Sequence, residues 1–163
     1  MPTRPSVYIE TTIVGHLTTR LPKDPIVVGQ MLATRKWWDE ARQRFTLVTS
    51  QVVINEISAG DPTGATDRLK IVSDLALAQL TKDSIDLADQ LLIRHALPEK
   101  ARVDAVHVAV AATNSIEYLM TWNCRHLANA TMRSKINDTC RECGFEPPII
   151  CTPYELIDEV QDA

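Results

Sequence analysis

Short apolar runs that alternate with longer segments of helical pattern are the feature that most constrains the fold of this chain. The expected strands are too apolar to turn one face toward water, and they cover residues 7–10, 45–49, 77–80, 118–121 and 149–151. Strands of this kind are typical of a parallel sheet with helices on both faces. The pattern predicts an α/β fold, a three-layer αβα sandwich with a mainly parallel central sheet, as a single domain over residues 1–163.

Capping residues set the expected helix boundaries. Asp24 before Pro25 is the order that opens a helix, and this helix is expected to reach about residue 44. Ser50 can cap the next helix, which carries the apolar residues between 52 and 57. The remaining expected helices are 63–75, a helix from a cap at Asp83 to about 95, 98–113, 128–143 before Gly144, and a short helix after Thr152-Pro153.

The charge balance limits how this chain can bind nucleic acid. The net charge is −4 and the isoelectric point is near 5.5, so binding through bulk positive charge is excluded. Any contact with nucleic acid would need a local basic patch, and two clusters are candidates, although both are also typical of solvated helix faces. They are Arg35, Lys36, Arg42 and Arg44, and Arg133, Lys135 and Arg141.

The apolar segments are short along the whole sequence. None approaches the roughly 20 residues that a membrane-spanning helix needs. The first residues lead directly into an expected strand, without the apolar stretch of a signal peptide. The sequence therefore predicts a cytoplasmic protein with no membrane segment.

Three acidic residues stand inside apolar sequence, where a carboxylate is costly unless it is paired or holds a metal. Glu10 ends the first expected strand, whereas Glu56 and Asp104 lie on apolar helices, and Asn123 follows the strand at 118–121. Ligands of parallel α/β sheets bind beyond the carboxyl ends of the strands. Each acid alone is typical of a solvent-facing or arginine-paired residue. The four together indicate one site for a hard cation, Mg²⁺ or Mn²⁺.

The order of four short motifs resembles the PIN-domain family, which includes the VapC-like ribonuclease toxins. The motifs are Tyr8-Ile9-Glu10-Thr11-Thr12, Val53-Ile54-Asn55-Glu56-Ile57, Asp104-Ala105-Val106-His107-Val108-Ala109 and Leu119-Met120-Thr121-Trp122-Asn123. The resemblance implies a PIN-like fold and a Mg²⁺- or Mn²⁺-dependent endoribonuclease, a hydrolase that leaves a 5′-phosphate and a 3′-hydroxyl. It also implies an RNA substrate, a homodimer, and an antitoxin protein as partner in a type II toxin–antitoxin pair.

The same resemblance assigns roles to residues. Glu10, Glu56, Asp104 and Asn123 are the expected catalytic and metal-binding residues, and Thr11 (or Thr12) and Thr121 are expected to orient the substrate. Two positions depart from the family pattern: Glu10 stands where Asp is usual, and Asn123 stands where many members have a fourth Asp. The lost charge at Asn123 should weaken a second metal. A non-catalytic PIN-like module that binds RNA or protein is the alternative.

Two histidines lie near these positions in the sequence. His107 is three residues after Asp104 and shares its helix face, so it could shape the site, or it could support the site from the core. His126 follows Asn123 by three residues and has the same two interpretations.

Cysteine and tryptophan residues leave further alternatives open. Cys140-x-x-Cys143, with Cys124 and Cys151, could bind zinc and stabilise a structural protein. The pair lies near an expected helix end, however, and reduced, partly buried thiols of a cytosolic chain are the favoured interpretation. Trp37-Trp38 could stack on RNA bases, or could pack in the core or in a dimer interface.

Overall fold

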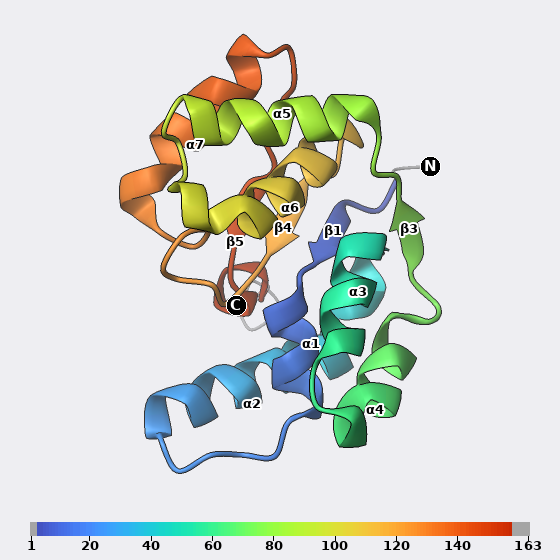
Figure 1. Cartoon of the computed structure of the whole chain (residues 1–163). Helices are drawn as coiled ribbons and strands as arrows, with labels where there is room; N and C mark the ends of the chain where they lie inside the picture. Colours follow the sequence, from blue (N-terminus) through green and yellow to red (C-terminus); the bar gives the residue numbers. More distant parts are fainter. Residues whose placement is uncertain (1–2, 158–163) are drawn as a thin grey trace, which may run out of the picture.

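Five parallel strands form one central sheet in the computed structural model, which describes residues 3–157 (Figure 1). The strand order is β3-β2-β1-β4-β5, and every neighbouring pair is parallel. The strands are β1 (Ser6–Ile9), β2 (Thr46–Ser50), β3 (Ala76–Ala78), β4 (Tyr118–Met120) and β5 (Ile149–Cys151). The predicted parallel sheet is confirmed. The predicted domain 1–163 also includes positions 1–2 and 158–163, which lie outside the described residues.

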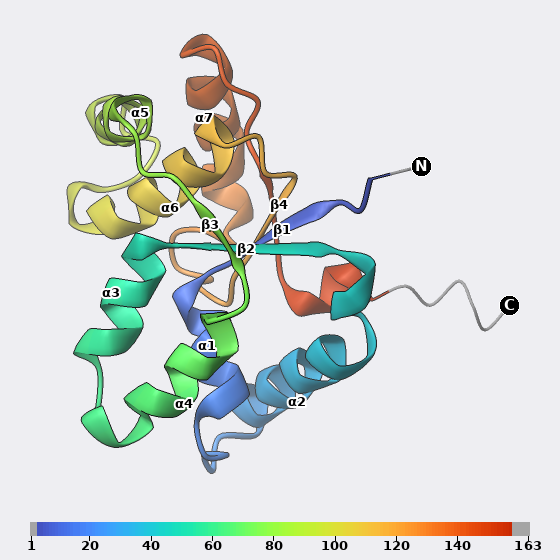
Figure 2. The ribbon, with the colours of Figure 1, turned by 90° about the vertical axis from the view of Figure 1, so that its right-hand side faces the viewer.

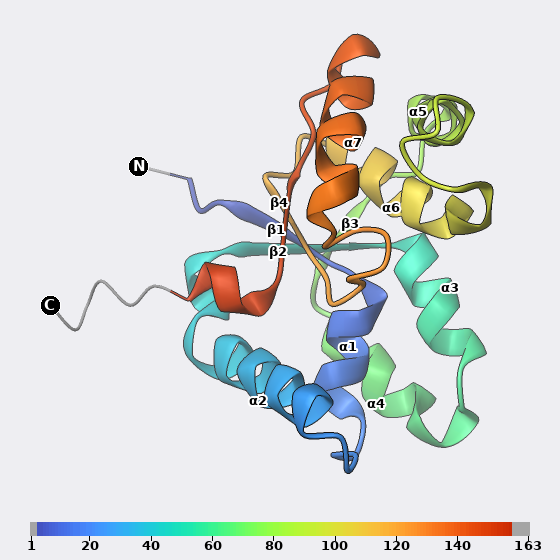
Figure 3. The same cartoon turned by 90° about the vertical axis from the view of Figure 1, so that its left-hand side faces the viewer.

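Helices cover the sheet on both sides. Figure 2 and Figure 3 show α5, α6 and α7 on one side and α1, α2 and α4 on the other, which confirms the three-layer sandwich. The helices are α1 (Thr11–Thr18), α2 (Pro25–Glu40), α3 (Gln51–Ala59), α4 (Pro62–Val72), α5 (Lys82–Ile93), α6 (Arg102–Thr113) and α7 (Ala130–Glu142). Three short 3₁₀ turns complete the set: η1 (Arg42–Arg44), η2 (Glu99–Ala101) and η3 (Pro153–Leu156).

The core is built around β1 and α6. Val7, Tyr8 and Ile9 of β1 have no exposed surface, because β1 lies between β2 and β4 with helices on both faces. Helix α6 is buried from Ala105 to Ala112 apart from Val106, and its many alanines allow it to lie close to the sheet. A helix that is apolar on all sides is typical of a buried position. Asp104, at the start of α6, is therefore held at a fixed place.

Helix α1 is absent from the elements predicted from the sequence. Its residues include three threonines, a valine and a glycine, which are poor helix formers, so no helical pattern stands out. Two tertiary features stabilise α1 despite these weak helix formers. The Glu10 side chain caps the helix by accepting from the Thr12 N–H, and Ile13 and Val14 are fully buried. Glu10 thus acts both as the residue after β1 and as the N-cap of α1.

Several predicted boundaries are wrong by a few residues. The helix expected to reach residue 44 ends at Glu40, and η1 follows it. The helix expected over 98–113 divides into η2 and α6. Helix α5 is capped by Thr81 in a capping box with Ser84, instead of by Asp83. Helix α7 begins two residues later than expected, with Asn129 as its cap, and β3 lies nearer the N-terminus than predicted.

Other capping predictions are confirmed. Ser50 accepts from the Val53 N–H and caps α3. Asp24 caps α2 ahead of Pro25. Gly144 has a φ of 91°, in the left-handed region that glycine favours, just after α7. Between residues 3 and 157 the structure has no helix of the length and apolar character needed to cross a membrane.

Candidate functional site

Glu10 lies at the carboxyl-terminal edge of the sheet, directly after β1. The residue is only 3% exposed, yet its carboxylate is well supplied with donors. Oε2 accepts from the Thr12 backbone N–H at 3.0 Å, from the Thr12 hydroxyl, and from the Thr121 hydroxyl at 2.8 Å. Charge-assisted hydrogen bonds of this kind offset the penalty of burying a carboxylate.

Thr12 is the threonine that accompanies Glu10. Besides donating to Glu10, its hydroxyl accepts the Trp122 backbone N–H at 2.8 Å, so it ties α1 to the segment after β4. Thr11 points elsewhere, because its hydroxyl donates to Oε1 of Glu56 at 2.7 Å. The sequence left Thr11 and Thr12 as alternatives at the first acid, and the hydrogen bonds separate their roles.

Glu56 lies on α3, and its side chain is 36% exposed. Oε1 accepts from Thr11 and from Nε2 of His107, each at 2.7 Å. Partial burial raises the pKa of Glu56. The hydrogen bonds that Glu56 accepts from His107 and Thr11 outweigh burial, so the pKa of Glu56 lies below its ordinary value. Glu56 is therefore a carboxylate at neutral pH.

Asp104 lies in the first turn of α6, with 17% of its side chain exposed. Oδ1 accepts from Nδ2 of Asn123 at 3.0 Å, and Oδ2 lies 2.9 Å from Nδ1 of His126. The amide oxygen of Asn123 accepts the His126 backbone N–H at 3.1 Å. Asn123 thus orients Asp104 and also shapes the turn that brings His126 to the same carboxylate.

These contacts join all four predicted site residues at one edge of the sheet. Thr121 donates to Glu10 and accepts the Asn123 N–H at 2.9 Å, Asn123 contacts Asp104, and His107 on the same helix as Asp104 contacts Glu56. Figure 1 shows how the end of β1, the start of α1, α3 and α6 lie around this edge. The sequence predicted this convergence from strand ends and helix positions.

The hydrogen bonds to Glu10 and Glu56 are unevenly divided between the two oxygens of each carboxylate. Every recorded donor to Glu10 reaches Oε2, and both donors to Glu56 reach Oε1. For residues 3–157, no hydrogen bond is recorded to Oε1 of Glu10 or Oε2 of Glu56. Carboxylate oxygens are the ligands that Mg²⁺ and Mn²⁺ prefer, so the donor chemistry fits such an ion.

The spacing of the acidic groups is wider than in a preformed all-protein cage. In the described part of the chain, no three His, Cys, Asp or Glu side chains are gathered closely enough to hold a metal ion among them. Mg²⁺ usually keeps several waters and needs only one or two carboxylates besides its substrate. An ion at this edge of the sheet would therefore have to be held partly through water.

His107 supports Glu56 from inside the core. The residue is fully buried, and its second ring nitrogen, Nδ1, lies 2.7 Å from the Tyr8 hydroxyl. Tyr8 in turn lies 2.6 Å from the Ser50 hydroxyl. The sequence identified His107, but Tyr8 was missed because a tyrosine inside an apolar strand has the pattern of an ordinary core residue.

The cysteines are free thiols. Cys140 and Cys151 are buried, and burial raises the pKa of each to about 12. Cys124 is exposed and Cys143 is partly buried. In the metal-free protein Cys140 and Cys151 therefore keep their protons at neutral pH.

The two tryptophans of α2 differ in environment. Trp37 is buried and packs against Phe45, whereas Trp38 is half-buried under the guanidinium of Arg42, 4.9 Å from its ring centroid. Trp37 is therefore a core residue. Arg42 is occupied by Trp38 and by the Trp38 carbonyl, and Arg35 donates to the carbonyls of His16 and Thr19. Within the basic cluster of Arg35, Lys36, Arg42 and Arg44, two arginines therefore already donate hydrogen bonds to backbone carbonyls of the fold.

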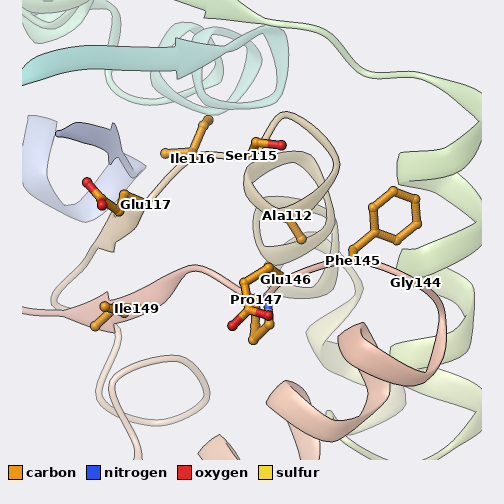
Figure 4. Close-up of a pocket in the computed structure, with 9 residues that line it drawn as sticks. All are labelled: Ala112, Ser115, Ile116, Glu117, Gly144, Phe145, Glu146, Pro147 and Ile149. Carbon is orange, nitrogen blue, oxygen red and sulfur yellow. The ribbon is translucent and has the colours of Figure 1, made fainter. Parts of the chain in front are cut away.

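A hollow of about 320 Å³ lies at the opposite edge of the sheet. Figure 4 shows Glu117 before β4, Ile149 at the start of β5, and Phe145 and Glu146 in the segment after α7. Asn123 follows the opposite end of β4, and Asp104 lies in the first turn of α6, whose last turn contributes Ala112 to the hollow. The hollow is therefore separate from the carboxylate site.

The chain was also compared with protein-family models and with curated proteins, and neither comparison gave a match.

Proposed function

We propose that this chain is a PIN-like, Mg²⁺- or Mn²⁺-dependent endoribonuclease that acts as the toxin of a type II toxin–antitoxin pair. The main observation in favour is that Glu10, Glu56, Asp104 and Asn123 meet at one edge of the sheet from four separate segments. In two of these carboxylates the recorded hydrogen bonds gather on one oxygen only. A carboxylate held on one side and open on the other is suited to binding a cation.

Glu10, Glu56 and Asp104 would hold the ion, directly or through water. A bound Mg²⁺ or Mn²⁺ would polarise the scissile phosphate and lower the pKa of an attacking water. The amide oxygen of Asn123 keeps a second lone pair beside the one that accepts the His126 N–H, so it is a further oxygen ligand or an orienting group.

The chain's own residues hold each carboxylate with two side chains. Glu10 is held by Thr12 and Thr121. Glu56 is held by Thr11 and His107, and Asp104 by Asn123 and His126. Supporting contacts of this kind fix the orientation of ligand carboxylates. Thr11 and Thr121, expected to orient the substrate, act here by orienting carboxylates.

The alternative is a non-catalytic PIN-like module that binds RNA or protein. One observation favours it: Asn123 supplies a neutral N–H donor to Asp104 where an acid would add a further ligand. In either case the proposed partners are RNA, an antitoxin protein and a second copy of the chain, and the proposed location is the cytoplasm. The two functions differ in whether the site binds a divalent ion productively.

Cleavage of a mixed RNA pool with Mn²⁺ tests the proposal. Wild type is compared with Asp104→Asn and Glu56→Gln, and with Asp86→Asn and Glu146→Gln as matched controls. Asp86 and Glu146 are exposed partners of Lys82 and Arg141, away from the site. Cleavage should depend on Mn²⁺, disappear in both site variants and persist in both controls. The same background level of RNA cleavage in all five proteins, with no effect of Mn²⁺ on the melting temperature, would contradict the proposed nuclease function. It would favour the non-catalytic binding module.

A further inference from the structure

Four side chains form a continuous hydrogen-bonded chain from the core to the site. The Ser50 hydroxyl lies 2.6 Å from the Tyr8 hydroxyl, which lies 2.7 Å from Nδ1 of His107. Nε2 of His107 lies 2.7 Å from Oε1 of Glu56. Ser50, Tyr8 and His107 are all buried, and they come from the end of β2, where Ser50 caps α3, from β1 and from α6. The chain therefore joins three elements behind a residue of the proposed site.

The available hydrogens give this chain a direction. A carboxylate only accepts hydrogen bonds, so Nε2 of His107 has to donate to Glu56. If Nδ1 accepts, Tyr8 donates to Nδ1 and Ser50 donates to Tyr8, and every hydrogen has an acceptor. Ser50 then still accepts the Val53 N–H, as the cap of α3 requires.

The opposite direction leaves one hydrogen without a partner. If Nδ1 donated to Tyr8, Tyr8 would donate to Ser50, which already accepts from Val53. Over residues 3–157, no acceptor other than Tyr8 is recorded for the Ser50 hydroxyl hydrogen. Because a buried donor without an acceptor is unfavourable, the first direction is preferred.

We propose that Tyr8 and His107 are positioning residues for Glu56: the Tyr8 hydroxyl keeps the His107 proton on Nε2, and this N–H holds Oε1 of Glu56 so that Oε2 faces the site. The value of this arrangement for catalysis rests on the proposed function. A half-exposed glutamate on a helix surface would otherwise exchange between rotamers. Donation from His107 on one side and Thr11 on the other restricts it to one orientation.

The tautomer can be measured without metal or RNA. Protein labelled with ¹⁵N at its four histidines gives long-range ¹H–¹⁵N spectra that separate a protonated ring nitrogen from a bare one. The signal missing from His107→Gln assigns His107. In wild type we expect a protonated Nε2 and a bare Nδ1. A protonated Nδ1 with a bare Nε2 would overturn the inference.

Tyr8→Phe tests the role of the hydroxyl, because phenylalanine keeps the buried ring. We expect the His107 proton to lose its preference for Nε2. We also expect the Mn²⁺ affinity, read from the dependence of the melting temperature on Mn²⁺ concentration, to fall roughly 10- to 100-fold, as for other supporting residues of metal ligands. Tyr118→Phe is the matched control, since Tyr118 lies on β4 and packs against Phe45. Tyr118→Phe should change neither the tautomer of His107 nor the Mn²⁺ affinity.

A second pair of variants covers the case in which Tyr8→Phe does not fold. His107→Gln keeps an N–H donor within reach of Glu56, whereas His107→Phe keeps only the ring, so Mn²⁺ affinity should fall further in His107→Phe. Equal affinity in wild type and the folded variants would overturn the positioning role. If wild type neither binds Mn²⁺ nor cleaves RNA, the proposed function fails, while the spectra still decide the direction of the hydrogen-bonded chain.

Discussion

The hydroxyl of Thr121 donates to Oε2 of Glu10 over 2.8 Å and connects positions that are 111 residues apart. The register of the sheet explains this contact, because Ile9 of β1 pairs with Met120 of β4. The next residue of each strand therefore lies beside its neighbour, with both side chains on the same face. A carboxylate and the hydroxyl that satisfies it are thus placed by strand pairing itself.

Replacing Thr121 with valine should destabilise the protein even without metal. Valine has a similar shape but cannot donate to Glu10 or accept the Asn123 N–H. Loss of a partner by a buried carboxylate costs about 1–3 kcal/mol. Urea unfolding of Thr121→Val should show a loss of this size, and Thr121→Ser, which keeps the hydroxyl, should lose less. Equal losses in the two variants would show that the methyl group matters instead of the hydrogen bond.

Asn123→Asp should weaken the metal-free protein and strengthen its response to Mn²⁺. The substitution removes the N–H that Asp104 accepts at 3.0 Å and places two carboxylates in contact. Like charges at this distance repel by up to ~4 kcal/mol in a partly solvated site. The melting temperature should fall without metal, and Mn²⁺ should raise it more than in wild type. A variant with an unchanged Mn²⁺ response would argue against an ion beside Asp104.

The buried thiols predict a loss of stability at alkaline pH. Burial raises the pKa of Cys140 and Cys151 from 9.0 to about 12. Below pH 9 both thiols keep their protons in the folded and unfolded states, and their contribution to stability is fully present. As the pH rises from 9 toward 12, the unfolded chain releases protons that the folded chain retains, so the free energy of unfolding falls.

Alanine variants isolate this effect. Between pH 8 and pH 10, each buried thiol should account for a loss of roughly 1 kcal/mol, since one unit of pKa shift corresponds to 1.36 kcal/mol. The double variant Cys140→Ala/Cys151→Ala should show a smaller alkaline loss than wild type. Cys124→Ala, at an exposed position, serves as the control. Parallel pH profiles of wild type and the double variant would refute the prediction.

Trp37 should tolerate phenylalanine better than alanine. Its indole is 1% exposed and packs against Phe45, but its Nε1–H is buried without a hydrogen-bond partner in the described structure. Trp37→Ala should lose about 3–5 kcal/mol through the cavity it leaves. Trp37→Phe keeps much of the apolar contact and removes the unpaired donor, so urea unfolding should show a clearly smaller loss. A loss as large as that of Trp37→Ala would mean that the indole N–H is satisfied.

The sequence was sufficient to predict the sheet and the edge at which the site forms. Strands too apolar to face water indicated a parallel sheet covered on both faces, and the carboxyl ends of these strands placed Glu10 and Asn123 at the same edge. The caps at Asp24 and Ser50 were readable because a side chain bonds to the backbone two or three residues ahead. Local chemistry of this kind does not depend on the rest of the fold.

The different hydrogen-bond partners of the neighbouring residues Thr11 and Thr12 could not be predicted from the sequence. Thr11 and Thr12 point about 100° apart on a helix, and α1 itself escaped prediction because tertiary contacts hold it together. Without α1, nothing in the sequence says which hydroxyl meets Glu10 and which meets Glu56. Tyr8 was missed for a related reason: its partners Ser50 and His107 are 42 and 99 residues away.

The central place of β1 in the sheet has a consequence for synthesis of the protein. β1 is the first strand to be made, but its neighbour β4 is made only after more than two thirds of the described chain. A growing polypeptide on the ribosome therefore carries Glu10 long before Thr121 and Asn123 exist to complete its surroundings. Assembly of the carboxylate site is therefore deferred until late in the translation of the described residues.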